Sequence, residues 1–425
     1  DLPNEVSVDD LNAFRTPAQR RMIFEEFFLF QIGHAWRRHA TSADLKPVVP
    51  KVDDRIRASA AKILPFKLTP GQKQALKEIV EDMLQPQPMH RLLQGDVGAG
   101  KTIVALLAAI VAMENGLQVA FMAPTEILAV QHYGNIARLL APTRFRVDLL
   151  TGSTSSPDKL TIEAHLERGA SHLVVGTHAL VQERIAFHRL GLVVIDEQHR
   201  FGVAQRAALR AKGLRPDVLL MTATPIPRTL ALTDYSELDV SKIPDLPPHR
   251  RPVRTVVKPE SRRDEVYSLI RQQLEAGRQG YVIYPLVEGS EKVDLKSATE
   301  MADHLQAEVF PTWKVALLHG RMKQDAKDRV MQSFVRGQTQ ILVSTTVVEV
   351  GVDVPNATVM VVEHAERFGL SQLHQLRGRV GRGEWESYCV LLYQAPWTDD
   401  ARERLKAMAE TTDGFVIAER DLELR

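Results

Sequence analysis

A glycine-rich stretch carries the clearest chemistry in this sequence. Residues 95–102 read Gly-Asp-Val-Gly-Ala-Gly-Lys-Thr and match the phosphate-binding pattern G-x-x-x-x-G-K-[ST]. Glycines let backbone N–H groups surround phosphate oxygens, and a helix that begins at the turn adds partial positive charge. A glycine-rich turn without a ligand is the alternative. We expect a nucleotide site with these residues: Gly95, Gly98, Gly100, Lys101 and Thr102.

Two carboxylates follow a later apolar run. Leu192–Ile195 precede Asp196 and Glu197, and the carboxyl ends of strands are where a doubly wound sheet presents its catalytic groups. Asp196 can hold Mg²⁺ through water, and Glu197 can orient an attacking water. An acidic pair that only caps the next helix is the alternative. Behind a phosphate loop, we expect Asp196 and Thr102 at a metal ion and Glu197 in catalysis.

The elements that position these residues show a regular alternation. Short apolar runs alternate with helical patterns, which favours a parallel sheet covered by helices on both faces. In the first unit the runs are Leu117–Met122, Val147–Leu150, His172–Val175, Leu192–Ile195 and Val218–Met221. A proline-rich linker occupies residues 244–252. The alternation then restarts with Val253–Val257, Tyr281–Leu286, Val315–Leu318, Ile341–Val343, Val359–Val362 and Cys389–Leu392.

The two ends of the chain read as helical. Aromatic and aliphatic residues recur every four positions from Phe24 to Trp36, which predicts a helix over about Pro17 to Ser42 packed on a neighbouring domain. The segment after Thr398 is charged and helical and has no core of its own. We therefore expect an α/β protein with a helical connector (1–64), two parallel-sheet domains (65–246 and 247–396) and a terminal helical segment (397–425).

Composition limits the remaining classes. A length of 425 residues suits two to three domains, and a formal net charge of +1 shows no overall basic excess. The single cysteine, Cys389, excludes a disulfide framework, fits a reducing cytoplasm and is expected to be buried. No apolar run is long enough to span a bilayer. The chain starts at Asp1 without Met and stops within a charged run, so we expect a fragment of a longer protein.

An ordered series of motifs resembles the superfamily 2 helicases. The acidic pair continues as Asp-Glu-Gln-His, which resembles their second motif. The other matching segments are Phe66 to Gln72 (the adenine-reading motif), Ala123 to Glu126, Gly176 to His178, Thr222 to Pro225, Ser344 to Asp353, and Gln375 to Arg382. The resemblance implies two tandem RecA-like domains that bind ATP and Mg²⁺ between them.

Longer strings resemble the RecG branched-DNA helicases of bacteria. These strings are GDVGAGKT, DEQHRFGV, MTATPIPRTL and HAERFGLSQLHQLRGRVGRG. The transcription-repair coupling translocases share much of this pattern, but we expect a second Glu in them where Gln198 stands. The RecG family also carries an OB-fold wedge domain before the connector and a glycine-rich translocation loop that should begin just beyond Arg425. Neither is within this sequence, so we expect a motor core.

The resemblance also implies a role for particular residues. Arg379 and Arg382 should reach the γ-phosphate from the second domain, since a planar, always-charged guanidinium stabilises equatorial phosphate oxygens; a solvated basic turn is the alternative. Further nucleotide contacts are expected from Phe66, Gln72, Gly351 and Asp353. DNA phosphates should meet Pro124, Thr125, Gly176, Thr177, His319, Arg321, Ser344 and Thr345. Coupling between nucleotide and DNA should involve His199, Thr222, Thr224 and Gln375.

The function expected from this resemblance is an ATP-dependent helicase or translocase acting on stalled forks and Holliday junctions in recombination and repair. We expect sequence-independent DNA contacts, a single-stranded DNA-binding protein as a second partner, and a bacterial cytoplasmic, nucleoid-associated location. A transcription-coupling translocase and a nucleotide-gated DNA-binding scaffold without turnover are the alternatives. A small-molecule kinase would need neither the second unit nor the arginine motif.

Overall fold

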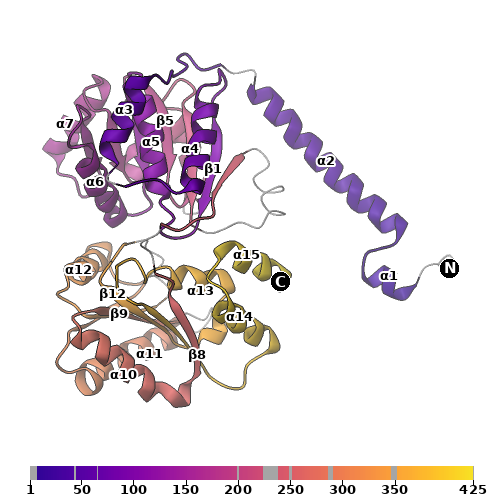
Figure 1. Cartoon of the computed structure of the whole chain (residues 1–425), viewed down its shortest axis with the longest axis vertical. Helices are drawn as coiled ribbons and strands as arrows, with labels where there is room; N and C mark the ends of the chain where they lie inside the picture. The colour runs from indigo at the N-terminus through magenta and orange to yellow at the C-terminus, as the bar shows by residue number, and fades with distance from the viewer. Residues whose placement is uncertain are drawn as a thin grey trace.

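Two α/β lobes and a projecting helix make up the computed structural model of this chain (Figure 1). The structure describes residues 7–42, 45–64, 66–198, 201–223, 238–247, 251–285, 291–345 and 352–424. We call the described residues of 45–247 the first lobe and those of 251–424 the second lobe. Each lobe contains one parallel sheet, so the predicted α/β class with two parallel-sheet units is confirmed.

The first lobe has a seven-stranded sheet in the order β3-β4-β2-β5-β6-β1-β7. The strands are β1 (His90–Gly95), β2 (Gln118–Met122), β3 (Val147–Leu150), β4 (Leu173–Gly176), β5 (Leu190–Ile195), β6 (Asp217–Thr222) and β7 (Asp239–Ile243). The helices are α3 (Asp54–Ile63), α4 (Pro70–Met83), α5 (Lys101–Glu114), α6 (Glu126–Leu140), α7 (Ser156–Glu167) and α8 (Val203–Arg210), with a 3₁₀ turn η1 (His178–Val181). The phosphate loop follows β1 and the acidic pair follows β5, so both lie at the same sheet edge with only β6 between their strands.

Sequence analysis missed one strand of this sheet. β7 pairs in parallel with β1 and places Ile243 beside Gly95. Its sequence, Asp-Val-Ser-Lys-Ile, contains three polar residues and no continuous apolar run, and the strand lies at the sheet edge. Only a strand at an edge tolerates that pattern in an otherwise buried parallel sheet.

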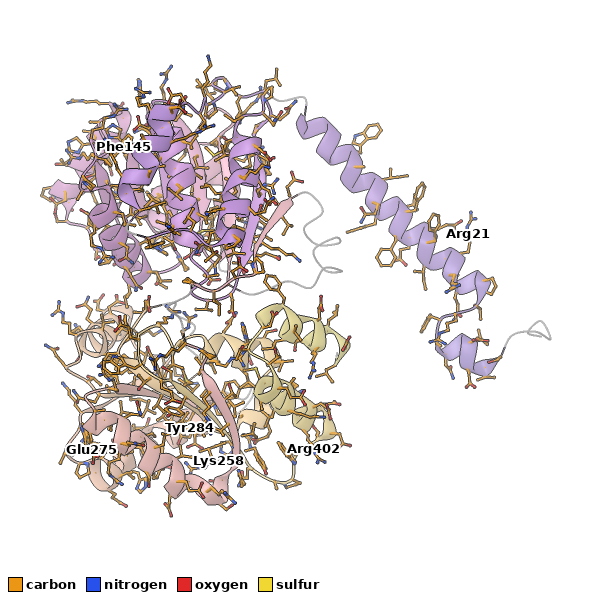
Figure 2. All side chains as sticks on the ribbon, in the orientation of Figure 1. Arg21, Phe145, Lys258, Glu275, Tyr284 and Arg402 are labelled. Atoms are coloured by element: carbon orange, nitrogen blue, oxygen red, sulfur yellow. The ribbon has the colours of Figure 1, made fainter. Side chains whose placement is uncertain are left out.

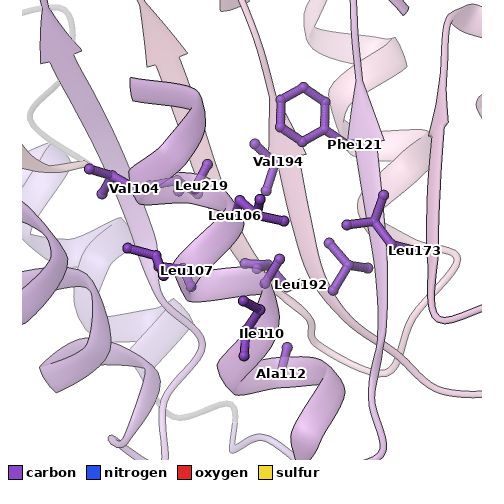
Figure 3. Packing of buried hydrophobic residues seen from close by; sticks show 14 of the residues in the cluster. Val104, Leu106, Leu107, Ile110, Ala112, Phe121, Leu173, Leu192, Val194 and Leu219 are labelled. Carbon is purple, nitrogen blue, oxygen red and sulfur yellow. The ribbon is translucent and has the colours of Figure 1, made fainter. Parts of the chain in front are cut away.

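The helix that follows the phosphate loop forms the centre of the first lobe. From Ile103 to Met113 every residue of α5 is buried, as expected for a helix that is apolar all round. Figure 3 shows Leu106 and Ile110 of this helix directed at strand residues that include Leu192 and Val194. α3 and α4 cover its other side. A helix held on both faces keeps the phosphate loop at its N-terminus in a fixed position.

The second lobe repeats this plan with six parallel strands in the order β10-β11-β9-β12-β13-β8. They are β8 (Arg254–Pro259), β9 (Gln279–Tyr284), β10 (Val315–Leu318), β11 (Ile341–Thr345), β12 (Ala357–Val362) and β13 (Tyr388–Tyr393). The helices are α10 (Arg263–Glu275), α11 (Glu291–His304), α12 (Gln324–Val335), α13 (Leu370–Arg377), α14 (Asp399–Glu410) and α15 (Gly414–Glu423), with short turns η3 (Glu260–Arg262), η4 (Leu305–Val309) and η6 (Ala365–Arg367). Cys389 is buried in β13, as predicted, and burial raises the pKa of its thiol to about 12.

The N-terminal and C-terminal helices differ in how they pack on the rest of the chain. After the short α1 (Val8–Asn12), the long helix α2 (Pro17–Ser42) has the predicted bounds, but its described side chains from Arg20 onward are exposed rather than packed on a domain (Figure 2). By contrast, α14 and α15 add Leu405, Met408 and Ile417 to the core of the second lobe. In the part of the chain that the structure describes, no helix has both the length and the apolar character needed to cross a membrane.

Candidate nucleotide site between the lobes

The phosphate loop has the backbone that anion binding requires. Gly98 and Gly100 have φ values of 80° and 86°, in the left-handed region that favours glycine. Gly95 is tightly enclosed, since a Cβ there would lie 3.2 Å from the Cβ atoms of both Ala99 and Ile243. No side chain caps the N-terminus of α5. Its first N–H groups can therefore bind phosphate oxygens.

Lys101 is held inside the loop it belongs to. Its Nζ donates hydrogen bonds to the carbonyl oxygens of Gly95 at 2.7 Å and Asp96 at 3.0 Å. Burial lowers the pKa of Lys101, and the negative charges of Glu197, Asp196 and Asp96 oppose that shift. The predicted lysine and both predicted carboxylates therefore act on one another within one site. A phosphate would compete with the loop carbonyls for the ammonium.

The acidic pair turns sharply at the end of β5. The backbone N–H of Asp196 donates to the carbonyl of Met122 at 2.9 Å, which continues the sheet past the strand end. Glu197 then adopts a left-handed backbone with φ of 47°, and its N–H donates to Asp196 Oδ1 at 3.0 Å. This conformation is strained for a residue with a Cβ, and such strain concentrates at functional sites.

A histidine that sequence analysis missed completes this cluster. His132 of α6 places its Nε2 2.8 Å from Asp196 Oδ2. Burial raises the pKa of Asp196, but the hydrogen bond and charge of His132, the charge of Lys101 and the N–H of Glu197 outweigh it and leave that pKa low. One signal was present in the sequence. His132 lies four residues from both Leu128 and Ile136, so it is a polar residue on the buried stripe of its helix.

The arginine motif of the second lobe reaches the same site. Arg382 donates from Nε to the carbonyl of Gly378 at 3.1 Å, and its Nη1 lies 3.2 Å from Asp353 Oδ1. Its positive charge also lowers the pKa of Lys101. Arg379 is buried, and Arg382, Arg379 and Asp353 all act on the pKa of Tyr281, which burial raises. The structure thus brings Arg382 within electrostatic range of Lys101 in the phosphate loop, and Asp353 pairs with this arginine.

Direct contacts join the phosphate loop to α13. His374 Nε2 lies 2.9 Å from Asp96 Oδ1, across the boundary between the lobes. A Cβ added to Gly378 would lie 2.9 Å from the side chain of Val97. Only glycine permits this approach without a shift of the valine. His374 was not singled out in the sequence, because its partner is a loop residue far away along the chain.

The two predicted adenine-reading residues, Gln72 and Phe66, differ in burial. Gln72 is buried, with Oε1 accepting from the N–H of Thr69 at 2.9 Å and Nε2 donating to the carbonyl of Ala99 at 2.8 Å. In this structure Gln72 therefore caps α4 and braces the phosphate loop. Phe66 is half exposed and accessible for stacking. A contact between Gln72 and adenine stays a prediction and would require these hydrogen bonds of the Gln72 side-chain amide to rearrange.

The predicted DNA contacts in the first lobe divide by exposure. Pro124 and Thr125 are partly exposed at the start of α6, where the Thr125 hydroxyl accepts from the N–H of Leu128 at 3.4 Å. Gly176 and Thr177 are buried at the end of β4. The first pair can meet a phosphate as the structure stands, and a contact from the second pair stays a prediction.

The corresponding residues in the second lobe divide in the same way. Arg321 is exposed, and His319 is partly buried; burial lowers the pKa of His319, with a further contribution from the charges of Lys327 and Arg321. The positive charges of Arg321 and Lys327 beside His319 suit phosphates. Ser344 and Thr345 are buried, and the Ser344 hydroxyl lies 2.9 Å from the carbonyl of Leu318. The Ser344 side chain supports the sheet in this structure.

The coupling residues are only partly covered by the structure. Thr222 is buried at the end of β6, in register with Gln94 of β1, and Gln375 is partly buried on α13. His199, Thr224 and Gly351 lie outside the described residues.

The donor set of the site fits Mg²⁺ bound together with a nucleotide. Asp96, Asp196 and Glu197 supply hard oxygen ligands around a buried ammonium. Within the described ranges, no group of three His, Cys, Asp or Glu side chains forms a metal site by itself. Mg²⁺ commonly uses one or two carboxylates and completes its octahedron with phosphates and water. Asp196 and Thr102 are the residues that would hold it.

Comparison with known proteins places these features in a known group. Residues 69–233 match the DEAD/DEAH box helicase family, and residues 263–384 match the helicase conserved C-terminal domain. The ATP-dependent DNA helicase RecG of Synechocystis sp. is 52% identical over 96% of this chain and 49% of its own length. The ATP-dependent DNA helicase RecG of Aquifex aeolicus is 50% identical over 100% of this chain and 54% of its own length.

A solved structure shows the same relationship in three dimensions. The structure of RecG bound to a three-way DNA junction superimposes with a TM-score of 0.84 and 47% sequence identity. The match covers 96% of this chain and 53% of that one. This chain therefore spans about half the length of the relatives it matches.

Proposed function

Because this chain belongs to the RecG-type helicases, we propose that it is an ATP-driven DNA translocase motor core that acts on branched DNA in recombination and repair. The observation that carries the proposal is the composite site. Lys101, Asp196 and Glu197 come from the first lobe, and Arg382 approaches from the second. A site divided in this way makes lobe closure depend on the nucleotide, since only a closed state can make both sets of contacts.

The first lobe would bind the nucleotide and activate water. N–H groups at the start of α5, where no side chain caps the helix, would hold the phosphates, and Lys101 would exchange its two loop carbonyls for phosphate oxygens. When bound, Mg²⁺ neutralises charge on the β- and γ-phosphates. Asp196 and Thr102 would hold the ion, and Glu197 would accept a hydrogen bond from the attacking water.

The second lobe would stabilise the charge that develops during phosphoryl transfer. Arg382 pairs with Asp353 in this structure and is held by the carbonyl of Gly378. A γ-phosphate in the cleft would offer its guanidinium a stronger partner, because arginine binds equatorial phosphate oxygens in a planar fork. Loss of that phosphate would return Arg382 to Asp353. This exchange would convert hydrolysis into lobe movement.

DNA would bind through groups that position a phosphate backbone without reading bases. Arg321 and Lys327 supply positive charge beside His319 on the second lobe, and Thr125 lies at the partly exposed start of α6 on the first. Binding should therefore be independent of sequence and sensitive to salt. Branched DNA, a single-stranded DNA-binding protein as a second partner, and a place at the bacterial nucleoid are proposals that rest on the relatives.

The test is phosphate release by the 425-residue chain with and without forked DNA. We expect forked DNA to stimulate release, and Lys101→Ala to abolish it while the fold is retained, because the phosphates lose their buried ammonium. Lys77→Ala, an exposed lysine on α4, is the control. A folded Lys101→Ala protein with normal stimulated release would contradict the proposal. Nucleotide and DNA binding without any turnover in wild type would favour the scaffold.

A further inference from the structure

His132 occupies a position that the proposed reaction does not yet explain. It is a buried polar residue on α6, and its ring packs against Phe121 with 4.8 Å between ring centroids. Its Nε2 lies 2.8 Å from Asp196 Oδ2. Packing fixes the ring, and the hydrogen bond fixes the carboxylate.

The chemistry of the pair determines which atom carries the proton. An ionised carboxylate accepts hydrogen bonds and donates none, so Nε2 of His132 carries the hydrogen and donates it to Asp196. The other oxygen of Asp196 accepts from the N–H of Glu197 at 3.0 Å. Each carboxylate oxygen is therefore held by one donor and keeps a lone pair for another ligand. Partners of this kind orient metal-binding groups and contribute to metal affinity.

The residue before His132 faces the other lobe. Gln131 Oε1 accepts from the N–H of Asp353 at 3.1 Å, and its Nε2 lies 3.5 Å from the carbonyl oxygen of Asp353. Ile127, one turn earlier on the same face, packs against the core of the second lobe. Asp353 in turn pairs with Arg382. Adjacent residues of α6 thus touch the metal-site carboxylate and the partner of the catalytic arginine.

We propose that His132 is a positioning residue for Asp196, and that α6 makes this position depend on docking of the second lobe at Gln131. The inference rests on the proposed function, because it assigns Asp196 to magnesium. His132 itself touches neither nucleotide nor metal. It acts by orienting the carboxylate of Asp196. The position of α6, and with it the position of His132, depends on whether the second lobe is docked at Gln131.

The experiment compares two substitutions that separate ring packing from hydrogen bonding. His132→Phe keeps a ring against Phe121 but removes the donor, whereas His132→Gln keeps an N–H donor near the Nε2 position. The readout is the Mg²⁺ concentration that half-saturates binding of a fluorescent ADP analogue. We expect His132→Phe to raise this Mg²⁺ concentration about tenfold. His132→Gln should bring it most of the way back to the wild-type value. Affinity for the same analogue in excess EDTA should stay unchanged in both variants.

The matched control is His172→Phe. His172 also packs against a phenylalanine, with 5.4 Å between its ring centroid and that of Phe145, and it accepts from the N–H of Arg146. An unchanged Mg²⁺ dependence in His132→Phe overturns the inference. So does an equal loss of analogue affinity in EDTA, or a His132→Gln variant that needs as much Mg²⁺ as His132→Phe. Gln131→Leu should shift the Mg²⁺ dependence in the same direction, and no shift there overturns the link to the second lobe. A wild-type chain that binds no nucleotide overturns the proposed function instead.

Discussion

Glu197 combines a strained backbone with the position expected of the water-orienting carboxylate. Its left-handed φ of 47° follows directly from the end of β5, and its own N–H is used to hold Asp196. A left-handed residue with a side chain costs on the order of 1–3 kcal/mol. The surrounding sheet must therefore impose this conformation, in which Glu197 acts electrostatically on Lys101.

For Glu197→Gln we expect normal binding of ATP and Mg²⁺ with very slow hydrolysis. Asp196 still holds the metal in this variant, whereas the carboxylate that orients water has lost its charge. Equilibrium binding of a nucleotide analogue and single-turnover phosphate release separate the two effects, with exposed Glu183→Gln as the control. A parallel loss of affinity and turnover would instead assign Glu197 to binding.

At the scale of elements, a buried ion pair anchors the segment before α3 to the first sheet. Lys46 Nζ lies 3.0 Å from Asp217 Oδ1 and also donates to the carbonyl of Met83. Asp217 accepts from the N–H of Met89 at 2.7 Å. Both side chains are almost fully buried. The pair therefore joins the segment before α3, the end of α4 and the start of β6.

For Lys46→Met we expect a loss of about 3–5 kcal/mol in the free energy of unfolding at pH 8, because the carboxylate is left buried without its cation. Burial raises the pKa of Asp217 to about 6 despite the charge of Lys46. A raised carboxyl pKa gives stability that is present below the unfolded pKa and is lost as pH rises through 6. Without Lys46 the pKa of Asp217 should rise further, so the difference from wild type should widen above pH 6.

The double variant Lys46→Met/Asp217→Asn provides the control for this pair. The amide oxygen can still accept from Met89, and neither position carries a charge. Urea unfolding at pH 5 and pH 8 should show most of the stability restored at pH 8. A double variant as unstable as Lys46→Met would show that the loss comes from packing.

At the scale of the whole molecule, the two lobes meet through their functional loops. Asp96 and Val97 of the phosphate loop contact α13, and Gln131 of α6 contacts Asp353. Lys242 of β7 lies over the ring of Phe415 in α15, 5.3 Å from its centroid. α15 of the second lobe therefore also contacts the first lobe. Lobe movement would alter these contacts together.

For Arg382→Ala we expect nearly unchanged nucleotide affinity in the first lobe but turnover reduced at least about a hundredfold, since arginine fingers contribute roughly 10³–10⁵ in rate. ATP-dependent closure should also weaken, because the contact between Arg382 and the γ-phosphate exists only in the closed state. Fluorescent labels at Leu160→Cys on α7 and Val335→Cys on α12, both exposed positions, report closure, and buried Cys389 stays unlabelled. Wild-type closure and turnover in Arg382→Ala would exclude the composite site.

Much of the architecture follows from local sequence pattern. The apolar run before Asp196 predicts a strand, and the parallel arrangement of the sheet brings the acidic pair and the phosphate loop to one edge. The helix expected after the phosphate loop is uniformly apolar, which agrees with its complete burial as α5. These features depend on residues close together in the chain. The motif resemblance added the expectation that Arg379 and Arg382 reach the γ-phosphate from the second domain, which no local pattern contains.

The tertiary structure alone decided how separate segments meet. It placed His132 on Asp196 and His374 on Asp96, buried Ser344 beneath its strand end, and packed α14 and α15 on the second lobe. Each of these outcomes depends on the docking of elements far apart in sequence. A histidine on an apolar stripe looks the same whether its partner is a water, a backbone carbonyl or a catalytic carboxylate. Only the fold brings a particular partner within 3 Å, because hydrogen bonding requires contact that sequence spacing does not specify.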